Sequence, residues 1–228
     1  MTQRSCAFFD VDDTLIRIKS MFDFFQHWCD EELGNPLLYA QFSNYFAYAR
    51  ENGTPRTVLN RDYYRFFSGT EPDDLATAAQ NWAKKRIGPD LFYPEAIDRL
   101  INLRNDGMLP VLVSGSFPEL LQPIAVHLGV KEILSTKMQI GADGFYTGEI
   151  EPPQTIGQGK AEAIETFLKR RNVHPEDFWA FGDDLSDLPM LEFVGNPVVV
   201  GNGGELVKVA QRRNWPILEI SEASTVSA

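Results

Sequence analysis

Two aspartates separated by one residue follow the first apolar run of the chain. The run is Cys6-Ala7-Phe8-Phe9, and Asp10 and Asp12 come directly after it. Alternate residues of an extended segment point the same way, so both carboxylates can face the space beyond the end of a strand. This arrangement suits covalent phosphoryl chemistry, with one carboxylate as a nucleophile beside a hard cation and the other as a proton donor and acceptor. A solvated turn has the same local composition.

Polar residues that could bind a phosphate or a cation occur at three later points. Ser114 and Gly115 end a second apolar run before a helical pattern, where a hydroxyl, backbone N–H groups and a helix N-terminus can bind a phosphate. Lys160 opens another helical pattern, a position that disfavours a cation unless it reaches an anionic site. Asp183 and Asp187 follow a third run, where the first could bind Mg²⁺ and the second could orient Lys160. Taken singly, each also fits a helix cap or a solvated side chain.

The apolar runs predict the strands that must position these residues. Such runs occur at residues 5–10, 109–113, 178–181 and 197–200, and helical patterns lie over residues 118–128, 160–171 and 185–193. Alternating strands and helices indicate an α/β fold with a mainly parallel sheet covered on both faces. Ligands of such sheets bind at the carboxyl ends of the strands, where we expect the polar residues to meet.

Residues 16–89 interrupt this alternation with helices alone. Helix-like segments lie over residues 20–33, 36–51, 55–67 and 72–87, with short turns between them. The region holds 14 of the 27 aromatic residues, which predicts helices that pack on one another and present an apolar surface to the rest of the protein. We interpret this region as a helical insert after the first strand.

A hairpin and a tail complete the predicted elements. Residues 137–150 alternate apolar and polar side chains around Gly141-Ala142-Asp143-Gly144, which is typical of a β-hairpin. Residues 221–228 are small and polar, and we expect them to be disordered. A length of 228 residues suits one large domain or a domain with a substantial insert.

Composition excludes some partners. The formal net charge is −11, and no cluster of lysine and arginine offers a surface to a nucleic acid. The same charge repels anionic ligands at long range, so a phosphorylated ligand needs a local metal ion and a lysine. Cys6 and Cys29 lack metal-type spacing and are expected to be buried thiols in a reducing compartment. No segment resembles a signal peptide or a membrane span, so we expect no membrane partner and a cytoplasmic location.

As a set, the polar residues strongly resemble the motifs of the haloacid dehalogenase superfamily of phosphohydrolases. The first motif is similar to Asp10-x-Asp12-x-Thr14, the second to Ser114, the third to Lys160 and the fourth to Gly182-Asp183-x-x-x-Asp187. The resemblance implies a Rossmann-like core formed by residues 1–15 and 90–220. It also implies a helical cap over residues 16–89, which is where the phosphoserine phosphatase-like branch (subfamily IB) carries its cap.

The resemblance further implies a phosphatase that acts on a small phosphorylated metabolite. Asp10 is then the nucleophile that forms an aspartyl-phosphate, and Asp12 is the acid and base. Thr14 positions Asp12 or the phosphoryl group. Ser114, Gly115 and Lys160 bind the phosphoryl oxygens.

The cofactor implied by the resemblance is Mg²⁺. The ion is expected between the Asp10 carboxylate, the backbone carbonyl of Asp12 and Asp183. Asp187 is expected to act behind these ligands, on Lys160 or on a metal-bound water.

The substrate is not apparent from the sequence. Phosphoserine phosphatases place an acidic residue near the start of the cap, and the corresponding stretch here is Arg17-Ile18-Lys19-Ser20, which counts against phosphoserine itself. The basic side chains of Arg17 and Lys19 could meet an anionic or hydroxylated substrate, or be solvated. Candidate selectors in the cap are Phe22, Phe46, Arg56 and Arg65.

The residues leave one alternative to a phosphatase open and disfavour two others. A phosphotransferase or phosphomutase shares every core residue, and differs only in what attacks the aspartyl-phosphate. Dehalogenases of the superfamily lack the second aspartate, which is present here as Asp12. A binding protein without activity is disfavoured because all motif residues are intact. No catalytic role is assigned to His27, His127 or His174, and the sequence does not determine the oligomeric state.

Overall fold

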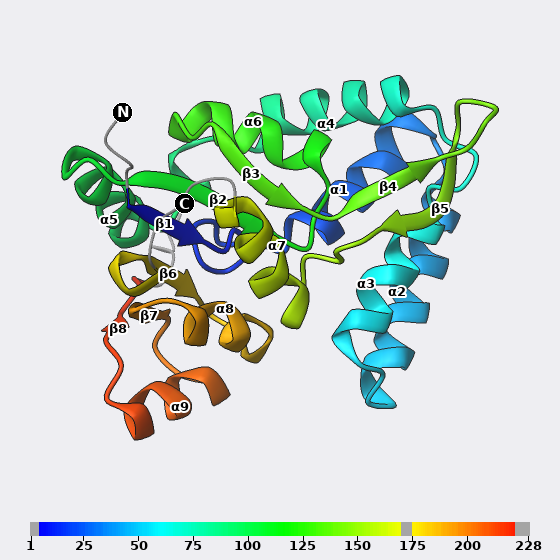
Figure 1. The fold of residues 1–228 in the computed structure, drawn as a ribbon. Coiled ribbons are helices and arrows are strands. Elements are labelled where there is room, and N and C mark those ends of the chain that lie inside the picture. Colours follow the sequence, from blue (N-terminus) through cyan, green and yellow to red (C-terminus); the bar gives the residue numbers. More distant parts are fainter. Residues whose placement is uncertain (1–4, 170–174, 222–228) are drawn as a thin grey trace, which may run out of the picture.

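A parallel β-sheet forms the centre of the protein (Figure 1). The computed structural model describes residues 5–169 and 175–221, and within these residues the sheet has six strands in the order β3-β2-β1-β6-β7-β8. The strands are β1 (Cys6–Phe9), β2 (Leu109–Ser114), β3 (Glu132–Ser135), β6 (Trp179–Gly182), β7 (Asn196–Val200) and β8 (Ile217–Leu218). Each neighbouring pair is parallel. The first strand of the chain therefore lies in the interior of the sheet, between β2 and β6.

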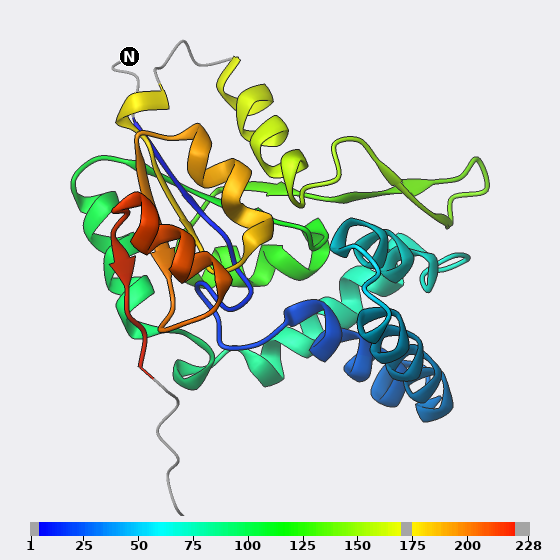
Figure 2. The ribbon, with the colours of Figure 1, turned by 90° about the horizontal axis from the view of Figure 1, so that it is seen from below.

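The two faces of β1 pack against different helices, because alternate residues of a strand point to opposite sides. Ala7 and Phe9 belong to an apolar cluster with α5 (Pro94–Asn105) and α6 (Pro118–Leu128). Cys6 and Phe8 belong to a second cluster with helices on the other face. These helices are α7 (Gln158–Lys169), α8 (Leu188–Phe193) and α9 (Glu205–Arg213) (Figure 2). The arrangement confirms the predicted α/β fold with a mainly parallel sheet covered on both faces.

Residues 20–86 fold as helices joined by turns, as predicted. The helices are α1 (Ser20–His27), which continues as a π-helical turn over Trp28–Glu32, α2 (Pro36–Glu51), α3 (Arg56–Arg65) and α4 (Pro72–Arg86). Proline at the first position of α2 and α4 loses no hydrogen bond, because the first N–H groups of a helix lack intrahelical partners. In both views α2 and α3 lie side by side away from the sheet, whereas α4 lies along α6 (Figures 1 and 2).

Aromatic side chains fill the interior of this helical region. The rings of Phe25 and Phe42 stack with centroids 4.1 Å apart. Phe24 and Phe67 reach Phe117, at the start of α6, with centroid distances of 5.5 and 5.9 Å. The aromatic cluster is continuous with the core on the α5–α6 face of the sheet. The aromatic residues therefore pack the helices on one another and onto the rest of the protein, as predicted.

The chain crosses between the sheet and the helical region twice, and the two crossings pair with each other. The N–H of Arg17 donates to the carbonyl of Leu91 at 2.8 Å, and the N–H of Tyr93 donates to the carbonyl of Leu15 at 3.0 Å. The residues between these bonds form an antiparallel bridge. The crossings thus form a short two-stranded ribbon that the sequence analysis did not predict.

The predicted hairpin is present and is tied to the helical region. Its strands are β4 (Lys137–Ile140) and β5 (Tyr146–Glu151), which pair antiparallel. The N–H of Gly69, in the turn after α3, donates to the carbonyl of Tyr146 at 2.8 Å. The N–H of Tyr146 in turn donates to the carbonyl of Thr70 at 2.9 Å. The hairpin therefore projects from the sheet edge toward α3 (Figure 1).

The sequence patterns located the interior strands and missed the outer ones. Apolar runs predicted β1, β2, β6 and β7, whereas β3, β8, α5 and α9 were not predicted. β3 is only partly buried along its length, and β8 contains 2 residues. Neither edge strand has the apolar run that signals a buried strand.

Other expectations concern the ends of elements and the surface. Parts of two predicted elements lie outside the described residues: residues 170–171 of one helix and residues 222–228 of the tail. His174 also lies outside them. Ser221 is described, and its N–H donates to Glu95 at 3.0 Å. Cys6 and Cys29 are both buried, as expected. Among the described helices, none is long and apolar enough to cross a membrane.

Replacing Phe67 by alanine is expected to destabilise the whole fold, because the ring is fully buried and touches both the helical region and α6. We expect a loss of about 3–5 kcal/mol in the free energy of unfolding, measured by urea denaturation. Tyr48→Ala is the control, because that side chain is 69% exposed and its loss should change stability by less than about 0.5 kcal/mol. Equal losses for the two variants would contradict the interior position of Phe67.

Candidate active site

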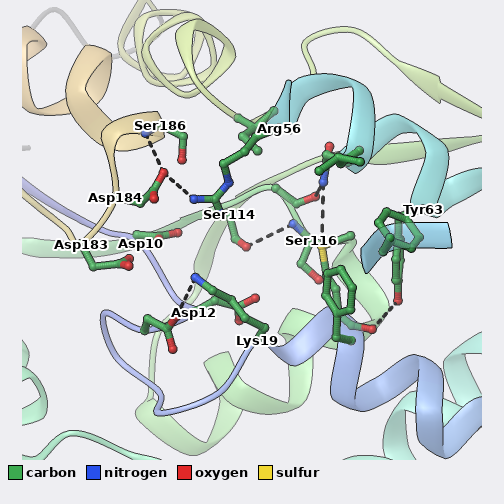
Figure 3. A pocket seen from close by; sticks show the side chains of 18 of the residues that line it. Asp10, Asp12, Lys19, Arg56, Tyr63, Ser114, Ser116, Asp183, Asp184 and Ser186 are labelled. Atoms are coloured by element: carbon green, nitrogen blue, oxygen red, sulfur yellow. Dashed lines mark hydrogen bonds and ion pairs between the residues drawn. The ribbon is translucent and has the colours of Figure 1, made fainter. Parts of the chain in front are cut away.

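The carboxyl ends of three adjacent strands meet at one cavity. Asp10 follows β1, Ser114 ends β2, and Asp183 follows β6. The N–H of Asp10 donates to the carbonyl of Phe181 at 2.9 Å, which extends the pairing of β1 with β6 to the first acidic residue. These side chains and Lys160 line a cavity of about 700 Å³ (Figure 3). The meeting of polar residues at the sheet edge is the arrangement expected from the sequence.

A tight loop after β1 turns Thr14 toward the end of β6. The carbonyl of Val11 accepts the N–H groups of residues 14–16, and Asp13 adopts a left-handed backbone with φ of 60°. Aspartate tolerates this conformation better than most residues. The buried hydroxyl of Thr14 donates to Asp183 Oδ1 at 3.0 Å. Thr14 therefore orients Asp183, whereas the sequence analysis assigned it to Asp12 or to the phosphoryl group.

Lys160 is the buried cation of the site. Its Nζ lies 2.6 Å from Asp10 Oδ1 and 2.6 Å from Asp187 Oδ1. Burial by itself lowers the pKa of Lys160, but the charges of Asp10 and Asp187 outweigh it and raise the pKa above its ordinary value. The ammonium therefore stays charged, and it fixes two carboxylates that come from different parts of the chain.

Glycine gives α7 room to bring Lys160 into the site. The helix begins at Gln158, and a Cβ at Gly159 would lie 1.7 Å from the carbonyl oxygen of Gln154. No side chain at position 159 could be accommodated without moving the backbone of Gln154. The sequence analysis noted the glycine beside Lys160 but not this close approach.

Asp187 connects Lys160 to the loop after β6. Its Oδ2 accepts the N–H groups of Asp183 at 3.1 Å and Asp184 at 3.2 Å, while Oδ1 binds Lys160. The close approach needs glycine at position 182, since a Cβ there would lie 2.6 Å from Asp187 Cβ. Both oxygens of Asp187 are thus occupied by protein donors.

Burial makes the acidic residues around the cavity reluctant to ionise. It raises the pKa of Asp12 to about 7, that of Asp183 to about 8 and that of Asp187 to about 6, and the charge of Asp10 adds to each shift. Asp12 Oδ1 is a buried oxygen without a hydrogen-bond partner among the described residues. A carboxyl group in this environment can hold a proton near neutral pH.

Three of these carboxylates are close enough to share a cation. Asp10, Asp183 and Asp187 each offer an oxygen, and these oxygens lie within 4.8 Å of one another. Because Asp187 is occupied by Lys160 and two N–H groups, Asp10 and Asp183 are the carboxylates that fit as direct ligands. A divalent cation would balance their charge and suits oxygen ligands.

The structure divides the predicted substrate selectors into two groups. Phe22, Phe46 and Arg56 line the cavity, and so does Lys19. Arg65 is not among the described lining residues, and its Nη1 instead lies 2.7 Å from Asp62 Oδ1.

Arg17 is turned away from the cavity. Its Nε donates to the carbonyl of Phe92 at 3.1 Å, and its Nη1 donates to the carbonyl of Ser221 at 2.7 Å. The guanidinium carbon also lies 4.5 Å from the centroid of the Tyr93 ring. The suggested contact of Arg17 with an anionic substrate is therefore not supported, because its N–H groups already donate to the carbonyls of Phe92 and Ser221.

Several residues at the site were not predicted. Asn60 and Tyr64, on α3, donate to the carbonyl of Gly115 at 2.9 and 2.5 Å. Ser116 is buried, lines the cavity and donates its N–H to Ser114 Oγ at 3.1 Å. Arg50 also lines the cavity. To identify Arg50, Asn60 and Tyr64, one must know which faces of α2 and α3 point toward the cavity. Helical periodicity alone does not give this orientation.

Together, the fold and the site define an α/β enzyme whose centre lies at the carboxyl edge of a parallel sheet. The family model for haloacid dehalogenase-like hydrolases matches residues 7–192, and the chain belongs to this family. The resemblance inferred from the sequence motifs is thereby confirmed.

A curated relative is similar to this chain in sequence, and solved structures are similar to it in fold. The chain is 32% identical over 223 residues to a protein of Mycobacterium tuberculosis named a probable phosphatase, with 96% of this chain and 76% of the relative covered. A Bordetella pertussis protein of unknown function has a similar fold, with a TM-score of 0.83, 24% identity, and 95% and 99% of the two chains covered. A phospho-aspartyl intermediate analogue of phosphoserine phosphatase has a TM-score of 0.65 at 19% identity, over 97% and 95% of the chains.

The raised pKa values predict that the protein without metal loses stability as pH rises. An acid with a higher pKa in the folded than in the unfolded state binds its proton more tightly when folded, so its ionisation favours unfolding. The loss should develop between the ordinary aspartate pKa of 3.8 and the value of about 8 for Asp183. The ion pairs of Lys160 stabilise the folded state throughout this pH window, because the pKa of Lys160 lies above it. They therefore do not change the direction of the expected effect.

We therefore expect the free energy of unfolding in chelator to fall by at least about 1 kcal/mol from pH 5 to pH 8. Urea denaturation at the two pH values measures it. Added Mg²⁺ should raise the melting temperature more at pH 8 than at pH 5. Stability in chelator that rises over this range would show that the acidic residues are not buried in this way.

Proposed function

We propose that the protein is a Mg²⁺-dependent phosphatase that hydrolyses a small-molecule phosphomonoester through an aspartyl-phosphate on Asp10. The observation that carries the proposal is the buried Lys160, whose Nζ holds Asp10 Oδ1 at 2.6 Å within the cavity. The name of the Mycobacterium tuberculosis relative, a probable phosphatase, supports the same activity.

Asp10 is proposed as the nucleophile. The contact with Lys160 uses Oδ1 and keeps the carboxylate in one orientation at the end of β1. The other oxygen, Oδ2, would attack phosphorus and displace the alcohol. Lys160 would neutralise charge on the phosphoryl oxygens as the transition state forms.

Asp12 is proposed as the general acid and base. A pKa of about 7 allows Asp12 to carry a proton before the reaction, which is what a leaving alkoxide requires. After the alcohol leaves, the ionised Asp12 would take a proton from the water that hydrolyses the aspartyl-phosphate. Asp12 lines the cavity, where its carboxyl group can reach a ligand.

Ser114 and Gly115 are proposed to bind the phosphoryl oxygens with Lys160. The Ser114 oxygen accepts the N–H of Ser116, so its own O–H proton is available to a ligand. Asn60 and Tyr64 donate hydrogen bonds to the Gly115 carbonyl and so fix the orientation of the peptide between Gly115 and Ser116.

A magnesium ion is proposed to be held by Asp10, the backbone carbonyl of Asp12 and Asp183, with Asp187 behind them. The carboxylates of Asp10 and Asp183 fit this ion, because each offers an oxygen within 4.8 Å of the other and oxygen is its preferred ligand. When bound, the ion would supply Lewis-acid stabilisation of the transferring phosphoryl group.

The helical region over residues 16–89 is proposed to act as a cap on a core of residues 1–15 and 90–220. Side chains from α2 and α3 complete the cavity whose floor is formed at the sheet edge. Arg56, at the start of α3, forms an ion pair with Asp184, in the loop after β6. This contact joins the proposed cap to the core across the cavity (Figure 3).

Asp10→Asn is expected to reduce the hydrolysis of p-nitrophenyl phosphate by at least about 10³-fold, because the amide is a poor nucleophile. Release of p-nitrophenol in the presence of Mg²⁺ measures it. Asp106→Asn is the matched control, because Asp106 is exposed at the end of α5 and should retain full activity. Equal rates for wild type and Asp10→Asn would refute the proposed mechanism. Phosphate transferred to an added alcohol instead of water would identify a phosphotransferase.

Asp12→Asn is expected to separate the two halves of the reaction. p-Nitrophenol leaves without much help from an acid, whereas hydrolysis of the aspartyl-phosphate needs the base. The variant should therefore release a burst of about one equivalent of p-nitrophenol, followed by a slow steady state. Stopped-flow absorbance measures the burst. A steady-state rate equal to that of the wild type would exclude Asp12 as the base.

A further inference from the structure

The two sides of the cavity carry opposite charge. The described carboxylates that line it all belong to the loops at the sheet edge: Asp10, Asp12, Asp13, Asp183 and Asp184. The described lining residues from the helical side include the cations Lys19, Arg50 and Arg56 and no carboxylate. A ligand whose phosphate lies at the sheet edge therefore extends its remaining part toward positive charge.

Two of the three cations are already paired with carboxylates of the sheet edge. Lys19 Nζ lies 2.6 Å from Asp13 Oδ2, and Arg56 forms an ion pair with Asp184. Arg50 has no carboxylate partner within the described part of the chain. The charge of Arg50 is therefore the one on this side that a ligand can neutralise.

A hydrogen bond from Nε and a contact with an aromatic ring hold the Arg50 side chain at the cavity wall. Its Nε donates to the carbonyl of Phe46 at 3.1 Å, and its guanidinium carbon lies 5.3 Å from the centroid of the Phe22 ring. Both aromatic side chains line the cavity. These contacts leave the N–H groups of the two terminal nitrogens to a ligand, and a guanidinium held in place loses less entropy on binding one.

Apolar side chains form part of the wall of the cavity that Arg50 and the aspartates line. The described lining includes five of them: Met21, Phe22, Phe46, Leu59 and Ile156. A polar linker would lose its hydration against this wall without gaining partners, whereas an apolar body would gain from burial.

We infer that the substrate carries a second anionic group, joined to its phosphate through an apolar body, and that Arg50 binds this group. The inference rests on the proposed phosphatase activity and specifies its substrate class. A substrate with an ammonium group at that end would meet Arg50 without finding a carboxylate on the helical side.

Three phosphomonoesters of matched shape test the inference: phenyl phosphate, para-carboxyphenyl phosphate and para-aminomethylphenyl phosphate. With the wild-type protein and Mg²⁺, we expect kcat/KM for the carboxylate to exceed that for phenyl phosphate by at least about tenfold, the effect of one charged hydrogen bond. The ammonium compound should be the poorest substrate. Phosphate release measures all three rates.

Arg50→Gln identifies the residue responsible. In this variant the ratio of kcat/KM between the carboxylate and phenyl phosphate should fall to about one, mainly through a higher KM for the carboxylate. Arg65→Gln is the matched control, because Arg65 belongs to the same helical region but pairs with Asp62 outside the cavity, and it should keep the wild-type ratio. Thermal unfolding of both variants checks that they fold.

The possible failures are distinguishable. No hydrolysis of any of the three compounds would overturn the proposed phosphatase and this inference together. Hydrolysis of phenyl phosphate without a gain from the carboxylate would overturn only the inference. The same holds if Arg50→Gln keeps the gain, or if the ammonium compound is the best substrate.

Discussion

The ammonium of Lys160 between Asp10 and Asp187 is the interaction on which the rest of the site depends. The three residues come from α7, from the end of β1 and from the loop after β6, and they share one buried contact. Removing Lys160 would leave the two buried carboxylates of Asp10 and Asp187 without their shared cation, which costs several kcal/mol. The same contact extends through Asp187 to the backbone of Asp183 and Asp184. One cation therefore connects the segments that follow β1 and β6.

An overall charge of −11 is compatible with an anionic substrate because the charges are segregated. At the sheet edge, buried carboxylates create a site that a divalent cation would neutralise. On the helical side, Lys19, Arg50 and Arg56 face the same cavity. Under the proposed function, a phosphorylated ligand would meet the metal ion and Lys160 at the sheet edge and Arg50 on the helical side, although the protein as a whole repels it.

Much of the sheet edge could be predicted from the sequence, because parallel strands place their carboxyl ends together. Asp10, Ser114 and Asp183 each follow an apolar run, so strand prediction alone brings them to one edge. The contact of Thr14 with Asp183 could not be predicted, since it depends on the left-handed backbone at Asp13.

The cavity-lining residues that come from α2 and α3 were harder to predict, for a different reason. A helix offers several faces, and the aromatic residues of α2 lie on more than one of them, since Phe42 and Phe46 are buried whereas Tyr48 is 69% exposed. The pattern therefore did not show that Arg50 and Asn60 line the cavity while Arg65 does not.

The paired crossings at Arg17–Leu91 and Leu15–Tyr93 restrict how the helices can move relative to the sheet. Sliding the helical region along the ribbon would break both backbone hydrogen bonds, whereas twisting or bending the ribbon as a unit breaks neither. A swing about these crossings would leave both hydrogen bonds in place, but it would separate Asn60 and Tyr64 from the Gly115 carbonyl. Such a swing carries α2 and α3 farthest, because they lie away from the sheet (Figure 2). Access for a ligand and the Arg56–Asp184 contact would then change in one movement.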